Sequence, residues 1–240
     1  MKTLFTTLTI ASATLLSAPA FAYEPGDFFV RAGAAMVDPN GDSDPIAIPG
    51  LGLGPIPDTS VDVDDDTQLG LTATYMFTAN LGLELLASTP FKHDISADLG
   101  GAGLGTAPVG DTKHLPPTVS AVWYIAGSTD AFKPYLGVGI NYTTFFSESV
   151  SGDLEALVGD LAGAGGPVPL EMELDDSLGV AFTAGFDYAI DAQWHLNASV
   201  RWIEIDTEAE ITNRDLGTII TVDSVDIDPW VYQINVGYSF

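Results

Sequence analysis

The chain has 240 residues, with 33 Asp and Glu against 7 Lys and Arg, no Cys, and a formal net charge of −26. This balance disfavours nucleic acid as a partner, because binding a phosphate backbone requires clustered Lys and Arg. The lack of Cys excludes disulfides, thiol catalysis and Cys-ligated metal sites. Yet 46% of the residues are hydrophobic and the mean hydropathy is +0.24, too apolar for disorder. A packed or membrane-embedded body must therefore carry strongly acidic segments, and the length fits one domain.

Residues 1–22, MKTLFTTLTIASATLLSAPAFA, have the pattern of a secretory signal peptide. Lys2 precedes an apolar, hydroxyl-rich middle, and Ala20-Phe21-Ala22 forms an Ala-x-Ala cleavage site before Tyr23. The alternative is an N-terminal membrane helix, which the short apolar core disfavours. No Cys follows the site, which excludes a lipoprotein anchor. We expect an exported mature chain, Tyr23–Phe240.

Eight segments of the mature chain alternate between apolar and small or polar residues with period two, which is typical of strands that face two different environments. In the last segment, Trp230, Tyr232 and Ile234 share one face, opposite Gln233 and Asn235. The predicted strands are Asp27–Val37, Thr67–Thr78, Leu81–Phe91, Leu115–Ala126, Lys133–Phe146, Ser177–Ile190, Gln193–Trp202 and Asp228–Phe240.

The links between these segments alternate between short and long. Short links fall at Ala79-Asn80, Gly127–Phe132 and Asp191-Ala192, and the long ones cover about residues 38–66, 92–114, 147–176 and 208–222. An antiparallel barrel with short turns on one side and long extracellular loops on the other has this rhythm. The first three long loops contain 19 of the 33 acidic residues. The sequence therefore predicts an all-β, eight-stranded antiparallel transmembrane barrel of the bacterial outer membrane, with its charge on the outer rim.

The alternative is a soluble sandwich or lipocalin-like barrel, which buries its apolar face and exposes its polar face. A solvent-exposed face normally carries many Lys and Glu, whereas the polar faces here consist mostly of Gly, Ser, Thr, Asn and Gln. We therefore expect the apolar faces to contact lipid and the polar faces to line a lumen. The larger or charged side chains predicted to line it are Arg31, Thr74, Glu84, Asp187, His195, Asn197 and Gln233.

Several stretches resemble one protein family over nearly the whole mature chain. They are TQLGLTATYMFTANLGLELLASTPFKHDI (67–95), KHLPPTVSAVWYI (113–125), KPYLGVGINYTTFF (133–146), FDYAIDAQWHLNASVRWIEIDTEA (186–209) and DIDPWVYQINVGYSF (226–240). The chain is similar to the outer membrane protein W (OmpW) family of Gram-negative bacteria. The resemblance implies an eight-stranded outer-membrane barrel with a narrow, largely hydrophobic lumen. It also implies passage of small hydrophobic molecules, with sideways exit into the lipid as one route.

The resemblance also implies a lumen constriction. One residue of the family's constriction matches Leu86, which the alternation independently points inward. The other is a Trp in the seventh strand, where this chain has Arg201. This departure argues against a dry apolar plug, and Arg201 is expected to pair with an inward carboxylate such as Glu84 or Asp187.

The fourth predicted strand begins with Leu115-Pro116-Pro117. Proline lacks an amide donor, so Pro116 and Pro117 interrupt ladder hydrogen bonds and could leave a lateral gap in the wall. An ordinary strand entrance after a loop explains the pair equally well.

Two functions remain open. An eight-stranded barrel is barely wide enough for its own side chains, which disfavours a general aqueous porin. Either the extracellular half forms a pocket for small apolar ligands and the barrel assists their passage, or the lumen is plugged and the protein is a structural or surface-interaction barrel. The partners expected are outer-membrane lipid and lipopolysaccharide, small hydrophobic ligands, and the barrel-assembly machinery through the C-terminal Phe240.

Catalysis is not expected. The three histidines are His93, His114 and His195, and no nucleophile–base spacing or paired catalytic carboxylates stand out. No cofactor is expected. The run Asp62-Val63-Asp64-Asp65-Asp66 could bind Ca²⁺, but it lacks the Gly and the closing Glu of the calcium-loop motif, so a solvated acidic surface is favoured. A short helix is predicted at Ser151–Leu161, ended by Gly163–Gly166.

Overall fold

The structure is a computed structural model that describes residues 23–103, 105–125 and 131–240. The predicted signal peptide and most of the predicted turn at 127–132 lie outside the described residues. Among the residues described, no helix is both long enough and apolar enough to cross a membrane.

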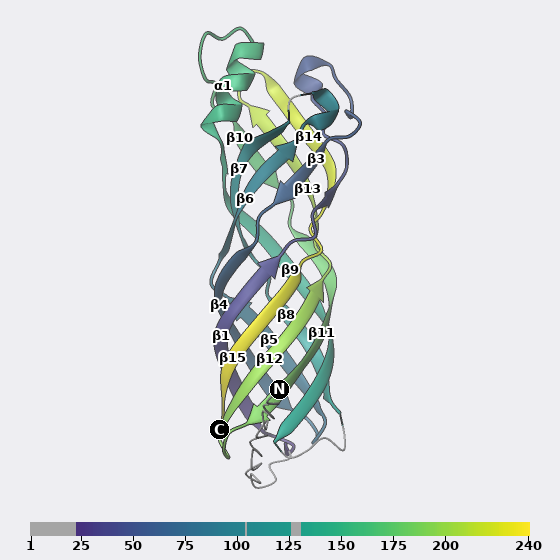
Figure 1. The fold of residues 1–240 in the computed structure, drawn as a ribbon, viewed down its shortest axis with the longest axis vertical. Coiled ribbons are helices and arrows are strands. Elements are labelled where there is room, and N and C mark those ends of the chain that lie inside the picture. The colour runs from purple at the N-terminus through teal and green to yellow at the C-terminus, as the bar shows by residue number, and fades with distance from the viewer. Residues whose placement is uncertain (1–22, 104, 126–130) are drawn as a thin grey trace, which may run out of the picture.

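Eight of the described strands close into an antiparallel barrel, which confirms the predicted fold (Figure 1). The ring closes because β9 pairs with β11 and the first strand pairs with the last. In order around the barrel the strands are β1 (Phe28–Asp38), β4 (Asp66–Met76), β5 (Leu81–Ser88), β8 (Thr118–Tyr124), β9 (Phe132–Val150), β11 (Ser177–Ala189), β12 (Trp194–Ile203) and β15 (Trp230–Ser239).

The faces of these strands are those that the alternation predicts. Outward side chains such as Leu71 and Ile140 are exposed, while inward ones such as Phe29 and Thr74 are fully buried. Aromatic side chains collect near the strand ends, where Phe28, Tyr238 and Phe240 contact one another. Apolar outward faces edged by aromatic residues are typical of a lipid-facing band.

The segments predicted as long loops are largely ordered strands, which stand above the barrel as an extension of its wall (Figure 1). β6 and β7 continue the barrel beside the long β9, and β3 is added at their edge, while β10, β13, β14 and β2 form a separate four-stranded sheet. The elements are β2 (Asp42–Ser43), β3 (Ser60–Val63), β6 (Phe91–Asp98), β7 (Thr106–Leu115), β10 (Glu171–Leu174), β13 (Asp206–Asn213), β14 (Gly217–Asp226), the 3-10 helices η1 (Pro49–Leu51) and η2 (Gly100–Ala102), and α1 (Gly152–Leu161).

Helix α1 confirms the predicted helix in the third long loop. The Ser151 hydroxyl accepts a hydrogen bond from the Leu154 amide at 3.2 Å, which makes Ser151 the N-cap. Gly163 follows the helix with a φ of +67°, a left-handed conformation that glycine adopts without strain.

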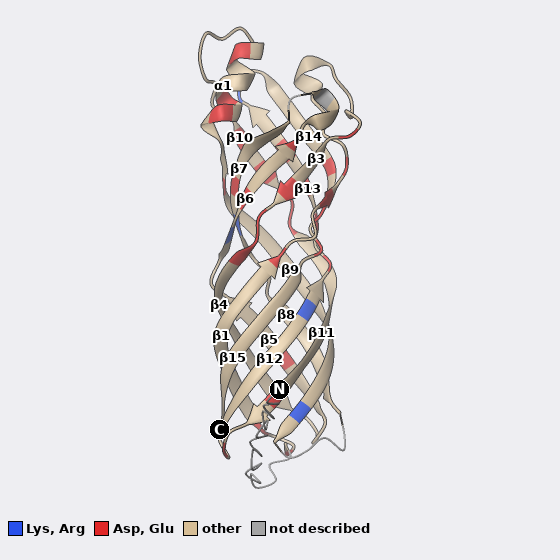
Figure 2. Cartoon of the chain, in the orientation of Figure 1, with Lys and Arg blue, Asp and Glu red and all other residues tan. Residues whose placement is uncertain are grey.

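Acidic residues are concentrated in this extension, whereas the barrel wall below carries few charged residues (Figure 2). Both termini of the described chain lie at the opposite end, where the short turns are (Figure 1). Short turns face the periplasm in barrels of this type. The extension is therefore the extracellular side.

Closure between the first and last strands depends on Gly33. A Cβ at this position would lie 2.0 Å from the Ile234 carbonyl oxygen and 2.7 Å from the Asn235 Cα, and both are backbone atoms that cannot move aside alone. We expect Gly33→Ala to destabilise the barrel by about 3 kcal/mol or more, at the upper end of overpacking effects. The folded fraction, measured by heat-modifiable gel mobility after refolding into vesicles, should fall. Gly54→Ala is the matched control, since nothing lies within 4 Å of its Cβ, and equal folding of the two variants would contradict the prediction.

Candidate functional site

The lumen of the barrel is crossed by two guanidinium groups and two carboxylates, Arg31, Glu84, Asp187 and Arg201, which we call the lumen network. Arg31 donates from Nη1 to Glu84 and from Nη2 to Asp187, both at 2.7 Å, and Arg201 Nη2 donates to the other Glu84 oxygen at 2.6 Å. All four side chains are at most 2% exposed. Their formal charges balance, as buried charges require.

Aromatic side chains surround the lumen network on its periplasmic side. The Tyr23 and Tyr124 hydroxyls donate to Asp187 at 2.8 and 3.0 Å, and the Arg31 guanidinium lies 4.7 Å from the centre of the Phe29 ring. Tyr124 also accepts a hydrogen bond from Arg31 at 2.6 Å. The network therefore fills the lumen with paired charges, although Arg31 Nε and Arg201 Nη1 have no hydrogen-bond partner among the described residues.

The other predicted lumen residues are also buried inside the barrel. Asn197 donates to Asp187 at 2.9 Å, and Thr74 accepts a weak hydrogen bond from Arg31 at 3.4 Å. His195 lies edge-on to Phe29, with ring centroids 5.5 Å apart. Gln233 and Leu86 are 2% and 4% exposed.

One expectation about the lumen needs correction, and the expected pairing of Arg201 with an inward carboxylate is confirmed. The resemblance implied a largely hydrophobic lumen, but the spanning part of this barrel holds a charged network, because Arg201 and its carboxylate partner replace an apolar plug. Of the two partners expected for Arg201, Glu84 is the one it contacts, while Asp187 pairs with Arg31. Leu86 is inward but belongs to none of the buried apolar clusters among the described residues.

A packed apolar layer lies on the extracellular side of the lumen network. Ile203 is the next inward residue after Arg201 on β12, and it pairs with Ala181 of β11. Every residue of this layer is at most 3% exposed. The layer comprises Ala35, Val37, Phe91, Ala181, Ile203, Ile205 and Val231. Together with the lumen network, it blocks a straight path along the barrel axis.

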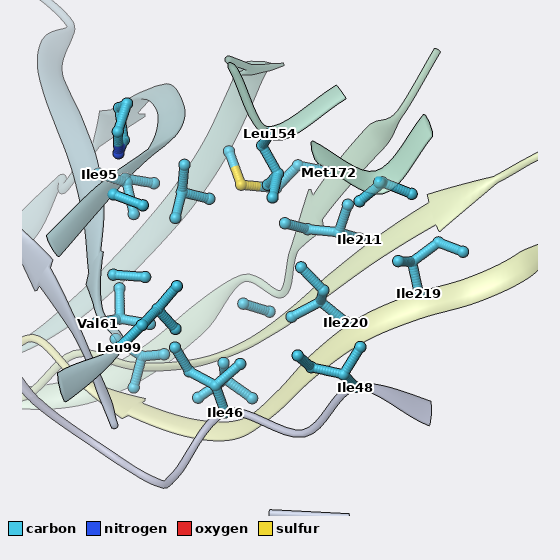
Figure 3. Close-up of a pocket in the computed structure, with 18 of the residues that line it drawn as sticks. Ile46, Ile48, Val61, Ile95, Leu99, Leu154, Met172, Ile211, Ile219 and Ile220 are labelled. Atoms are coloured by element: carbon cyan, nitrogen blue, oxygen red, sulfur yellow. The ribbon is translucent and has the colours of Figure 1, made fainter. Parts of the chain in front are cut away.

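Above the apolar layer, the extension encloses an apolar cavity of about 780 Å³. Aliphatic side chains from β3, β6, β10, β13, β14 and α1 converge on it (Figure 3). Representative lining residues are Ile46, Val61, Ile95, Leu154, Met172, Ile211 and Ile220. A pocket in the extracellular half was considered from the sequence, but the loop composition concealed its lining residues, because short alternating stretches such as Glu171–Leu174 are embedded among acidic, Gly and Pro residues.

Two stacked histidines lie at the edge of the cavity. The rings of His93 and His114 are 4.8 Å apart and nearly parallel, at 5°, and Phe91 and Phe145 flank the pair. Lys92 and Asp94, the strand neighbours of His93, are exposed and charged and form an ion pair, which places the pair of histidines above the lipid. Burial lowers the pKa of His93, and burial together with the neighbouring His93 lowers the pKa of His114 to about 3. Both imidazoles are therefore neutral at physiological pH.

The ladder of backbone pairs in the barrel wall is interrupted beside these histidines. The β5–β8 ladder ends with Leu86 opposite Thr118, and the β6–β7 ladder begins with Phe91 opposite His114. Between these pairs, residues 87–89 bond to β4, while Leu115 and Pro117 bond to β9. We call this region, residues 87–90 and 115–117, the wall split. Pro116 is buried and Pro117 exposed within it.

The acidic run at 62–66 is partly solvated, and one of its residues, Asp66, also makes structural hydrogen bonds. Asp66 accepts hydrogen bonds from the Lys92 amide at 2.8 Å and from the Gln68 side chain at 2.9 Å. The bond from Lys92 joins the start of β4 to β6 next to the wall split.

Comparison with known proteins gives the following. The family model described as "OmpW family" matches residues 24–240. Outer membrane protein W of Vibrio cholerae is 43% identical over 228 residues, which cover 95% of each chain. The crystal structure of the outer membrane protein OprG from Pseudomonas aeruginosa is 40% identical, with a TM-score of 0.76 over 91% of this chain and 98% of that one. The solid-state NMR structure of outer membrane protein AlkL shares the fold at 20% identity, with a TM-score of 0.62 over 99% of this chain and 97% of that one.

Proposed function

Because this chain belongs to the OmpW family of outer-membrane proteins, we propose that it assists the passage of small hydrophobic molecules across the bacterial outer membrane. The observation that carries the proposal is the apolar cavity of about 780 Å³ in the extracellular extension. Its volume falls within the range of known small-molecule sites, and its lining is mostly aliphatic, as expected for apolar ligands. An apolar molecule entering it leaves water and gains about 25 cal/mol for each Å² of surface buried.

The closed lumen supports a lateral route. A molecule in the cavity faces the apolar layer and, below it, a charged network that an apolar solute could enter only by separating buried ion pairs. The wall split adjoins the cavity through His114, and its outer side faces the upper edge of the lipid band. We therefore propose that solutes leave sideways through the split between residues 87–90 and 115–117 and enter the membrane directly.

A second candidate function is a structural or surface-interaction barrel without transport. The specific observation in its favour is the lumen network, which fills the spanning lumen with paired charges. The cavity favours transport, because a purely structural extension would gain stability by filling an apolar void of this size. Lipid around the exposed apolar band, and assembly machinery at the exposed Phe240, are partners that either function would require.

Uptake into liposomes tests the proposal. Reconstituted wild-type protein should accelerate entry of an apolar fluorescent probe over empty liposomes, and Ile95→Trp, which places a larger side chain in the cavity, should slow this entry. Asp94→Trp is the matched control, because the neighbouring side chain is exposed on the outer face. No uptake above empty liposomes by the wild type would exclude transport.

Arg201→Trp in the same assay separates the two routes. Uptake per folded protein should be unchanged if solutes leave through the wall split, since Arg201 lies in the lumen network below the apolar layer. A large change in rate would instead indicate a route along the barrel axis.

A further inference from the structure

The apolar cavity contains one unusual polar feature. Five of its lining residues carry polar side chains: His93, Thr112, His114, Asp153 and Thr207. Both threonine hydroxyls donate to backbone carbonyl oxygens, Thr112 to Lys113 and Thr207 to Asp175, and Asp153 lies on the exposed side of α1. The Nε2 atoms of His93 and His114 are buried and have no hydrogen-bond partner among the described residues.

The state of His93 follows from its other ring nitrogen. Nδ1 lies 2.5 Å from the Asp64 carbonyl oxygen, which can only accept, so Nδ1 carries the proton. In the neutral ring, Nε2 is then a lone-pair acceptor. A buried acceptor without a donor is unfavourable. His93 is only 2% exposed and its Nε2 has almost no accessible surface, so a donor in the cavity reaches Nε2 only when the side chains around it move aside.

We propose that the cavity binds neutral amphiphilic molecules, an aliphatic chain ending in one hydrogen-bond donor such as a hydroxyl, with His93 Nε2 accepting from that donor. This ligand class rests on the proposed function, in which the cavity is the ligand site. The aliphatic lining takes the chain, and the stacked histidines beside the wall split orient the polar end.

Other ligand chemistries fit less well. A metal ion must lie in the plane of each imidazole that binds it, and two nearly parallel rings stacked at 4.8 Å do not direct their lone pairs at one point. An anionic head group would gain no charge pairing from the neutral imidazole. It would also be repelled by the carboxylates of Asp64, Asp65 and Asp66, whose charges act on His93. An ammonium group would lose its hydration on entering an apolar cavity.

Binding of three matched probes tests the ligand class. The full chain in nanodiscs is loaded with N-phenyl-1-naphthylamine, and displacement by 1-decanol, decyl methyl ether and decanoate is measured against empty nanodiscs. Decanol can donate, the ether can only accept, and decanoate is anionic. One hydrogen bond corresponds to decanol binding about three- to tenfold more tightly than the ether, with decanoate weaker than decanol. Equal affinities of decanol and ether, or decanoate binding as tightly as decanol, would overturn the proposal.

A His93→Phe variant removes the acceptor and keeps the aromatic stack. Decanol should then bind only as tightly as the ether, whose affinity should not change, while Thr112→Val should leave the preference for decanol intact. The ¹⁵N chemical shift of His93 Nε2 provides a measurement on the wild type that needs no variant. It should move towards a hydrogen-bonded value with decanol and stay in place with the ether, and no movement with decanol would contradict the assignment.

The outcome is independent of transport. If decanol outcompetes the ether but liposome uptake fails, the transport proposal falls and the ligand class stands. If uptake occurs but alcohol and ether bind alike, transport stands and the role of His93 falls.

Discussion

Glu84→Gln is expected to destabilise the protein by about 3 to 5 kcal/mol, because it removes one partner from a buried charge network. Each Glu84 oxygen accepts from a different arginine, Arg31 at 2.7 Å and Arg201 at 2.6 Å. The neutral amide leaves two buried guanidinium groups facing only Asp187. Urea unfolding in vesicles, followed by Trp fluorescence, measures the loss.

Restoring the charge balance should recover part of this stability. In the double variant Glu84→Gln/Arg201→Gln, Arg31 and Asp187 remain as a balanced pair at 2.7 Å, so it should be more stable than Glu84→Gln alone. The surface control is Lys92→Gln, whose ion pairs are exposed and worth at most about 1 kcal/mol. A Glu84→Gln barrel as stable as the Lys92→Gln control would show that the lumen network is solvated rather than dry.

The sequence predicted the barrel because lipid and lumen impose opposite demands on alternate residues. Leu71 is exposed and Thr72 is buried, and this alternation can be read from the sequence alone. The inward positions of Arg31, Glu84, Asp187 and Arg201 follow from the same period of two. Which strands hold them was thus predictable without coordinates.

The pairing within the lumen was not predictable in the same way. Glu84 and Arg201 are 117 residues apart, and they meet only because the tilt and stagger of the closed barrel bring β5 and β12 to facing positions. Alternation fixes the side of the wall on which a residue lies, but not its height in the barrel. Both Glu84 and Asp187 therefore remained open as partners of Arg201.

A pocket for apolar ligands in the extracellular half was one of the two functions considered, but the residues that line it were not predicted. They come from short stretches between Ile46 and Ile227, mostly in segments whose acidic residues and glycines indicated solvated loops. The acidic residues do lie outside the barrel wall, as Figure 2 shows. The aliphatic residues between them, such as Ile95 and Ile211, point to the opposite side and line the cavity. A strand of four residues is too short for its period to stand out from a loop.

Acid should destabilise the extension through His114. Its pKa is about 3 in the folded protein because burial and the neighbouring His93 disfavour the charged ring, against an ordinary value of 6.5. Because the pKa is lower in the folded protein, the unfolded chain binds more protons between pH 6.5 and pH 3. The contribution of neutral His114 to the unfolding free energy is therefore fully present above pH 6.5 and falls as the pH decreases towards 3. For this one group the loss approaches about 2 to 3 kcal/mol by pH 4.5.

Comparison with His114→Phe isolates this contribution from the many carboxylates that also titrate. Phenylalanine fits the same aromatic stack between His93 and Phe145 and binds no proton. The difference in unfolding free energy, wild type minus variant, should be constant above pH 7 and decrease steadily between pH 6.5 and 4.5. Because carboxylates such as Asp66 titrate in both proteins, their effects cancel in this difference unless they are coupled to His114. A difference that stays constant to pH 4.5 would mean that water reaches the ring and that the cavity edge is open to solvent. Loss of probe uptake over the same pH range in the wild type, but not in His114→Phe, would tie the neutral histidine stack to the working state of the cavity.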